Sequence, residues 1–141
     1  MMRRVADTAA DESIKLGKPK PQALAVTVLT SHDDGSLNEI GVNFTTQDEV
    51  LRLAALAQKA GIDGLVCSGF EVEMLRKEFG DLFTLVVPGI RPGTDAHDQK
   101  RVVTPKEAVS RGADYLVIGR AITEAPNPET VVDGIIHEIL D

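Results

Sequence analysis

AQKAGIDGLVCS, residues 57–68, places a glycine and then an aspartate between the end of a helical pattern and a short apolar run. AVSRGADYLVIG, residues 108–119, repeats this order with glycine and aspartate at the equivalent positions. Glycine is favoured just past the carboxyl end of a helix, and short turns connect helices to strands in α/β proteins. The repeat therefore predicts βα units, in which each helix leads through a tight turn into a buried strand.

Four short apolar runs, rich in β-branched residues, do not alternate with polar residues; they lie at 23–29, 64–68, 83–89 and 115–119. Such runs are typical of strands buried on both faces of a parallel sheet. Helical patterns follow the first three runs at 47–61, 70–80 and 104–112, and a last helix is predicted over 128–140. This alternation predicts one α/β domain, residues 1–141, with right-handed crossovers. Such repeats build both (β/α)8 barrels and doubly wound sheets, and the spacing alone does not choose between them.

Capping signals mark the starts of the last two helices. Thr104 is the predicted N-cap of the third, with Pro105 at the first helical position and Glu107 completing a capping box. Asn127 is the predicted N-cap of the final helix.

The composition limits the class of protein. The chain has 141 residues, of which 43% are hydrophobic, and this suits one soluble domain with a real core. Its net charge of -7 argues against nucleic acid as a partner. The single cysteine, Cys67, excludes an internal disulfide and is read as a packed thiol. No stretch resembles a signal peptide or a membrane span, so we expect a cytoplasmic protein.

Polar residues follow the predicted strands, and in parallel α/β proteins the chemistry lies at the carboxyl ends of the strands. Gly119 and Arg120 suit a phosphate, because glycine lets a ligand approach the backbone N–H groups and the guanidinium offers a fork to phosphate oxygens. Arg120 could equally pair with an acidic residue of the last helix. Arg91, taken alone, suits a surface salt bridge. In TSHDDGS (30–36) we expect a solvated loop and a turn, and the three histidines lack metal-ligand spacing.

Five segments together resemble, in order and spacing, the C-terminal half of the bacterial orotidine 5′-phosphate decarboxylase family; they are AVTVLTS, GLVCS, LVVPGIRP, DQKRVVTPKEAVSRGADYLVIGRAIT and NPETVVDGI. The resemblance implies a (β/α)8 TIM barrel, usually a homodimer, that makes uridine monophosphate in pyrimidine biosynthesis. It implies that the four strands are the fifth to eighth of the barrel and that residues 1–21 form the preceding helix and connection. It also implies catalysis without a metal or an organic cofactor.

The same resemblance implies a set of residues that bind the nucleotide. Thr30 and Ser31, in LTS, resemble the residues that hydrogen-bond the pyrimidine ring. Gln99, in DQKR, resembles the tip of the loop that closes on the phosphate. Arg91 and the pair Gly119–Arg120 resemble the phosphate ligands. LTS and DQKR match the pyrimidine enzyme better than a related sugar-phosphate decarboxylase.

The family's catalytic motif, Asp-x-Lys-x-x-Asp, does not occur in the chain. The nearest match begins at Asp98 and Lys100 but lacks the second aspartate. We therefore predict no catalytic residue here and expect the chain to be the phosphate- and pyrimidine-binding half of a decarboxylase. Its expected macromolecular partner is the missing N-terminal half-barrel or a second copy of itself. The alternative is a non-catalytic half-barrel that binds phosphate and acts as a binding or assembly module.

Overall fold

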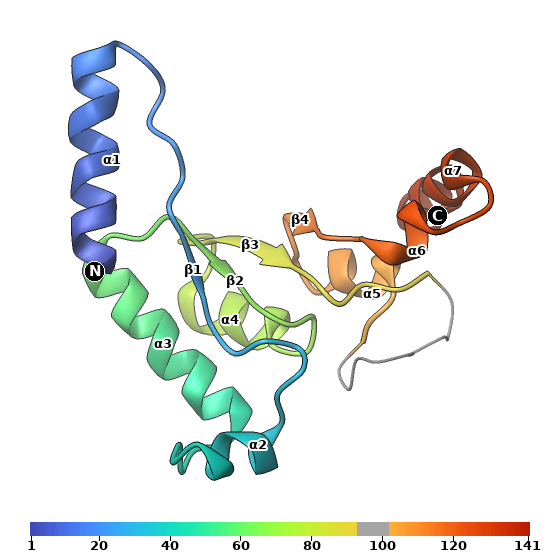
Figure 1. Ribbon diagram of the computed structural model, residues 1–141, viewed down its shortest axis with the longest axis horizontal. Coiled ribbons are helices and arrows are strands. Elements are labelled where there is room, and N and C mark those ends of the chain that lie inside the picture. Colours follow the sequence, from blue (N-terminus) through green and yellow to red (C-terminus); the bar gives the residue numbers. More distant parts are fainter. Residues whose placement is uncertain (93–101) are drawn as a thin grey trace.

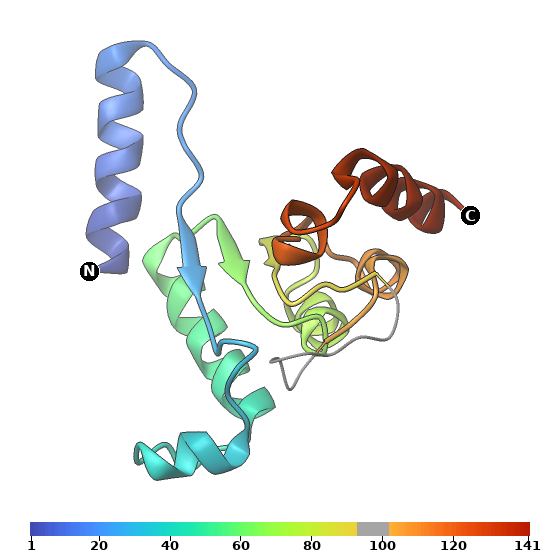
Figure 2. The same cartoon turned by 45° about the vertical axis from the view of Figure 1, so that its right-hand side comes forward.

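A computed structural model describes residues 1–92 and 102–141 and contains one parallel sheet (Figures 1 and 2). The strands are β1 (Leu24–Val26), β2 (Gly64–Val66), β3 (Thr84–Val87) and β4 (Tyr115–Leu116). Within these described residues they lie side by side in the order β1-β2-β3-β4, and every neighbouring pair is parallel. Consecutive strands around a barrel have this order, whereas a doubly wound sheet reverses its order at a switch point. The topology thus favours the barrel-type arrangement that the spacing left open.

Seven helices are present in the described residues: α1 (Met2–Leu16), α2 (Asp34–Glu39), α3 (Thr46–Ala60), α4 (Val72–Phe79), α5 (Pro105–Ser110), α6 (Arg120–Thr123) and α7 (Pro128–Leu140). The predicted starts of α5 and α7 are confirmed. The hydroxyl of Thr104 accepts from the Glu107 N–H at 3.2 Å, and the Glu107 carboxylate accepts from the Thr104 N–H at 2.9 Å. Asn127 Oδ1 accepts from the Thr130 N–H at 3.2 Å.

The short helices α2 and α6 were not predicted. Residues 30–33 form a turn and loop as expected, but the turn expected at 33–36 was wrong, because residues 34–36 begin α2. Asp33 Oδ1 accepts from the Ser36 N–H at 2.9 Å, and Ser36 Oγ accepts from the Asp33 N–H at 2.9 Å. This reciprocal capping starts α2. His32 is half-buried beside it, with Nδ1 3.2 Å from Ser36 Oγ. The helix has six residues, too few for an apolar period to appear in the sequence.

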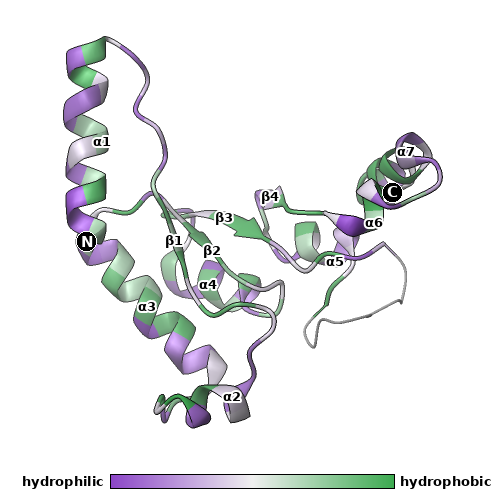
Figure 3. Cartoon of the chain, viewed as in Figure 1, coloured by the Kyte–Doolittle hydropathy of each residue, from purple (hydrophilic) through white to green (hydrophobic). Residues whose placement is uncertain are grey.

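Residues 1–92 and 102–141 cover only one face of the sheet, so the prediction of strands buried on both faces was wrong for this part of the chain. On the covered face, Leu65 and Leu85 pack in one core with α3 residues such as Val50, which is fully buried. On the opposite face, Val26 remains 57% exposed and Tyr115 61% exposed. Figure 3 shows hydrophobic residues along the strands, and Figures 1 and 2 show α3 and α4 beside the sheet. Side chains on the interior face of a barrel pack against those of all its strands, and the described chain supplies four strands.

The repeated aspartates join adjacent strands at their amino ends. Asp63 Oδ2 accepts from the Ala23 N–H at 2.8 Å, and Asp114 Oδ2 accepts from the Leu85 N–H at 2.7 Å. Burial opposes the ionisation of Asp63, but hydrogen bonds from Lys20 and from the Ala23 N–H, with the charge of Lys20, lower its pKa overall. The glycine–aspartate repeat thus ends a helix and then ties the following turn to the neighbouring strand.

Replacing Asp114 with alanine is expected to lower the free energy of unfolding by about 1–3 kcal/mol, the cost of leaving buried partners unsatisfied. The change removes the acceptor of the Leu85 N–H and of Arg76, whose Nη2 lies 2.6 Å from the carboxylate and whose side chain is only 19% exposed. Glu12→Gln is the control, since the Glu12–Lys15 pair is equally short but 50% and 66% exposed, and it should change stability by about 0.5 kcal/mol or less. Urea denaturation of both variants measures the difference. Equal effects would contradict the role of Asp114.

No helix in residues 1–92 and 102–141 is both long and apolar enough to cross a membrane.

Candidate functional site at the carboxyl ends of the strands

The predicted site residues lie in segments that leave the same edge of the sheet. Thr30 and Ser31 follow β1, Arg91 follows β3, and the pair Gly119–Arg120 follows β4. Since β3 and β4 are hydrogen-bonded neighbours, the two predicted phosphate-binding segments leave adjacent strands. The pyrimidine-binding segment leaves β1, which lies two strands from β3.

Arg91 is fixed by its backbone and not by its side chain. Its N–H donates to the carbonyl oxygen of Val103 at 3.1 Å, and Ile90 and Val103 form a parallel bridge. The side chain is half-buried. Within residues 1–92 and 102–141, the Arg91 guanidinium makes no hydrogen bond or ion pair. The structure therefore gives no support for the surface salt bridge that Arg91 suggests when taken alone.

Gly119 and Arg120 begin the short helix α6 and do not lie in an extended loop after β4. Gly119 is the N-cap residue, and its carbonyl oxygen accepts from the N–H groups of Ile122 at 2.8 Å and Thr123 at 3.1 Å. Both Gly119 and Arg120 are exposed. A Cβ atom built on Gly119 would meet no heavy atom of the described residues within 4 Å, apart from those of its chain neighbours. The surface beside the first turn of α6 therefore has room for a ligand.

Thr30 and Ser31 lie in a turn that is closed by a 3.0 Å hydrogen bond from the His32 N–H to the Leu29 carbonyl. Thr30 is buried and Ser31 is exposed, so the two side chains do not share one environment. Gln99, the remaining predicted site residue, lies outside the described residues.

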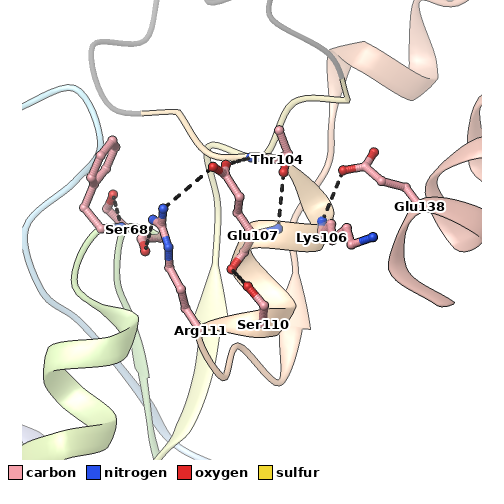
Figure 4. A network of polar contacts seen from close by, with 9 residues as sticks. Ser68, Thr104, Lys106, Glu107, Ser110, Arg111 and Glu138 are labelled. Atoms are coloured by element: carbon pink, nitrogen blue, oxygen red, sulfur yellow. Dashed lines mark hydrogen bonds and ion pairs between the residues drawn. The ribbon is translucent and has the colours of Figure 1, made fainter. Parts of the chain in front are cut away.

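A polar network at the same edge was not predicted from the sequence (Figure 4). Arg111 Nη1 donates to the Gly69 carbonyl oxygen at 3.0 Å, which joins the end of α5 to the loop after β2. In that loop, the Phe70 N–H donates to Ser68 Oγ at 3.3 Å. Arg111 and Gly69 are 42 residues apart, so no local sequence pattern reports their contact.

Glu107 connects this network to the start of α5. The hydrogen bond from the Thr104 N–H is the main cause of a lowered Glu107 pKa. Partial burial opposes the shift, while the Thr104 side chain and the charge of Arg111 add to it. The Glu107 carboxylate therefore remains ionised while it caps the helix.

A cavity of about 520 Å³ opens at the other, amino-terminal edge of the sheet. Its lining includes Asp63, Arg76 and Asp114. The two carboxylates bind strand N–H groups, and Arg76 donates to three backbone carbonyl oxygens as well as to Asp114. The polar groups that line this cavity are used in hydrogen bonds that stabilise the fold, so this cavity is not the candidate site.

Across residues 1–92 and 102–141, no cluster of three or more histidine, cysteine, aspartate or glutamate residues could hold a metal ion. The predicted site residues at the carboxyl edge of the described chain carry the guanidinium groups of Arg91 and Arg120 and the hydroxyls of Thr30 and Ser31. Such groups suit an oxyanion with a polar body.

The topology and these residues define an α/β protein of the barrel-forming type, with its polar groups at the carboxyl ends of the strands. The family model described as "Orotidine 5'-phosphate decarboxylase / HUMPS family" matches residues 1–135. The chain belongs to this family, whose decarboxylases are lyases of the pyrimidine pathway. The resemblance seen in the sequence is thus confirmed.

Curated relatives and solved structures agree with this membership. An orotidine 5'-phosphate decarboxylase of Haemophilus influenzae is 57% identical over 120 residues, which cover 84% of this chain and 52% of the relative. One of Nitrosococcus oceani is 52% identical over 132 residues, covering 93% and 57%. The crystal structure of the decarboxylase from Lactobacillus acidophilus matches with a TM-score of 0.75 at 36% identity, covering 100% of this chain and 58% of that one. The chain spans about half the length of the curated relatives it matches.

Proposed function

We propose that this chain supplies the phosphate- and pyrimidine-binding part of an orotidine 5′-phosphate decarboxylase, which forms uridine monophosphate. The observation that carries the proposal is the position of Arg91 and Gly119–Arg120 beyond the carboxyl ends of two adjacent parallel strands. Carboxyl-end loops are where α/β proteins bind phosphate. Family membership then favours a nucleotide as the bearer of that phosphate.

In this proposal each residue has one role. The guanidinium groups of Arg91 and Arg120 bind phosphate oxygens, and Gly119 leaves room for the phosphate beside the backbone. Thr30 and Ser31 hydrogen-bond the pyrimidine carbonyl and ring nitrogen. Gln99 contacts the phosphate from the segment after β3. The protein works in the cytoplasm and needs no metal or organic cofactor.

The proton donor for the ring carbon is proposed to lie outside these 141 residues. The chain has no Asp-x-Lys-x-x-Asp motif, and the residues assigned above bind the nucleotide without being able to protonate carbon. Binding energy from a remote phosphate accelerates a reaction only when it is coupled to groups that stabilise the transition state. The chain is therefore proposed to act together with a part that carries the motif.

The uncovered sheet face is the proposed surface for that part, and the four strands are proposed to be the fifth to eighth of a closed barrel. The exposed fractions are 43% for Leu24 and 57% for Val26 of β1, and 61% for Tyr115 of β4. In the part of the chain that the structure describes, β1 and β4 each pair with a strand on one side only. Exposed apolar strands and free edges favour pairing with another chain.

In sedimentation equilibrium the isolated chain should have a mass above 15.1 kDa, as two half-barrels associate. A compact 15.1 kDa monomer that unfolds cooperatively would contradict this.

A second candidate function is a non-catalytic module that binds phosphate and assembles with another protein. The absence of the catalytic motif from the chain favours it. Such a module would have the same phosphate site but a different protein partner. The two functions can be distinguished, since a module would not restore decarboxylation when combined with a part that carries the motif.

Isothermal titration calorimetry tests the binding proposal. Uridine monophosphate is expected to bind saturably, inorganic phosphate more weakly, and uridine more weakly than uridine monophosphate, because the charged contacts lie at the phosphate. Equal affinity for uridine and its monophosphate would remove the phosphate site from this edge of the sheet.

A further inference from the structure

Arg111 connects the end of α5 to the loop after β2 (Figure 4). Its Nη1 donates to the Gly69 carbonyl oxygen at 3.0 Å, and its guanidinium carbon lies 5.7 Å from the centroid of the Phe70 ring. Its Nη2 lies 3.9 Å from Glu107 Oε1. An ion pair of that length on a partly exposed helix contributes little. The contacts with Gly69 and Phe70 therefore dominate, and both belong to the loop after β2.

That loop packs directly on Val103. A Cβ atom on Gly69 would lie 2.2 Å from Val103 Cγ2, a distance that no real contact allows, so only glycine permits this approach without displacement. Gly69 itself is buried. The hydrogen bond from Arg111 to the Gly69 carbonyl oxygen therefore stabilises the packing of the loop after β2 on the Val103 side chain.

Val103 in turn fixes the backbone of Arg91. The Arg91 N–H donates to the Val103 carbonyl oxygen at 3.1 Å, and the Val103 N–H donates to the Gly89 carbonyl oxygen at 3.4 Å. The hydrogen bond from the Val103 N–H to Gly89 is long and therefore weak. The position of Val103 beside Arg91 thus depends also on the packing of the Val103 side chain. Gly69 provides that packing.

We propose that Arg111 is a positioning residue: it holds the loop after β2 against Val103 and thereby orients Arg91 toward the phosphate of the ligand. The role in ligand binding rests on the proposed function, whereas the effect on the Arg91 backbone does not. The path consists of contacts between described residues, Arg111 to Gly69, Gly69 to Val103, and Val103 to Arg91.

Arg111→Met tests the proposal, because methionine keeps an unbranched apolar stem but lacks the donor and the charge. Arg111→Lys retains the charge without the planar fork and should be intermediate. Arg52→Met is the matched control. Arg52 also lies 5.7 Å from a phenylalanine ring, that of Phe44, and pairs with a helix glutamate, but these contacts stay within residues 44–52.

Two measurements are made on the 141-residue chain. Amide hydrogen exchange followed by NMR should become faster at Arg91 and Val103 in Arg111→Met, and stay unchanged at Thr27, whose N–H donates to Val66 between β1 and β2. The affinity for uridine monophosphate should fall by about three- to tenfold, in the range typical of residues that act through others. Arg52→Met should change neither quantity.

Each result decides the proposal. Unchanged exchange at Arg91 in Arg111→Met would overturn it, and so would faster exchange at Thr27 as well, since Arg111 would then only stabilise the fold. Faster exchange confined to Arg91 and Val103 with unchanged affinity would overturn the role in ligand binding. If the wild-type chain binds no uridine monophosphate, the proposed function fails, and the exchange data alone still decide whether Arg111 orients Arg91.

Discussion

Replacing Arg120 with alanine is expected to weaken the binding of uridine monophosphate by about 30- to 150-fold, which corresponds to the loss of one charge-assisted bidentate contact of about 2–3 kcal/mol. The reason is the position of Arg120 as the first residue of α6, beyond the carboxyl end of β4 and beside the open surface at Gly119. The effect should appear in calorimetric titrations as a higher Kd. The folded structure should persist, because Arg120 is exposed.

Two further variants distinguish the loss of the bidentate Arg120–phosphate contact from the loss of one positive charge. Arg4→Ala removes the same charge from an exposed position on α1 and should leave the affinity unchanged. Arg120→Lys keeps the charge but cannot form the planar fork, so its affinity should lie between those of wild type and Arg120→Ala. Identical affinities for wild type and Arg120→Ala would remove Arg120 from the site. They would instead favour the other interpretation of the sequence, in which Arg120 pairs with an acidic residue of the last helix.

The regular elements could largely be predicted because their signals are local. The amphipathic period of α3 and the caps of α5 and α7 lie within a few residues of the elements they define. The uncovered sheet face could not be predicted, because an apolar run has the same sequence whether one layer or two will cover it. The helices α2 and α6 were missed since six and four residues are too short to show a period.

The sequence predicted which residues form the candidate site, and their binding roles stay a prediction, but it did not predict the contacts that support the segments around them. Strand ends can be read from the sequence, and the sheet order then places Arg91 and Arg120 after adjacent strands. The supporting contacts join residues that are far apart in the chain. Asp63 and Asp114 bind strand N–H groups 40 and 29 residues away, and Arg111 binds a carbonyl oxygen 42 residues away. No local pattern of residue types reports such contacts.

The largest expected effect is on catalysis. The 141-residue chain alone is expected not to decarboxylate orotidine 5′-phosphate, because its site residues are proposed to bind phosphate and pyrimidine and the chain has no Asp-x-Lys-x-x-Asp motif to supply the proton donor. Activity should return when the chain is mixed with a separately expressed part of the Haemophilus influenzae relative. That part is the portion that this chain does not cover, and it is proposed to carry the Asp-x-Lys-x-x-Asp motif.

Restored activity should depend on both parts. Replacing the motif lysine in the added part should abolish it, and Arg120→Ala in this chain should reduce it, whereas Arg4→Ala should not. A second copy of this chain in place of the added part should give no turnover, even if two half-barrels associate. A module that only binds phosphate would give no turnover in any mixture.

A spectrophotometric decarboxylation assay of the chain, the added part and their mixture therefore tests the central claim most directly. We expect no measurable turnover from either part and clear turnover from the mixture. Turnover by the 141-residue chain alone, in a preparation free of the host enzyme, would contradict the claim. It would mean that Lys100, Lys106 or another residue to which no catalytic role is assigned donates the proton.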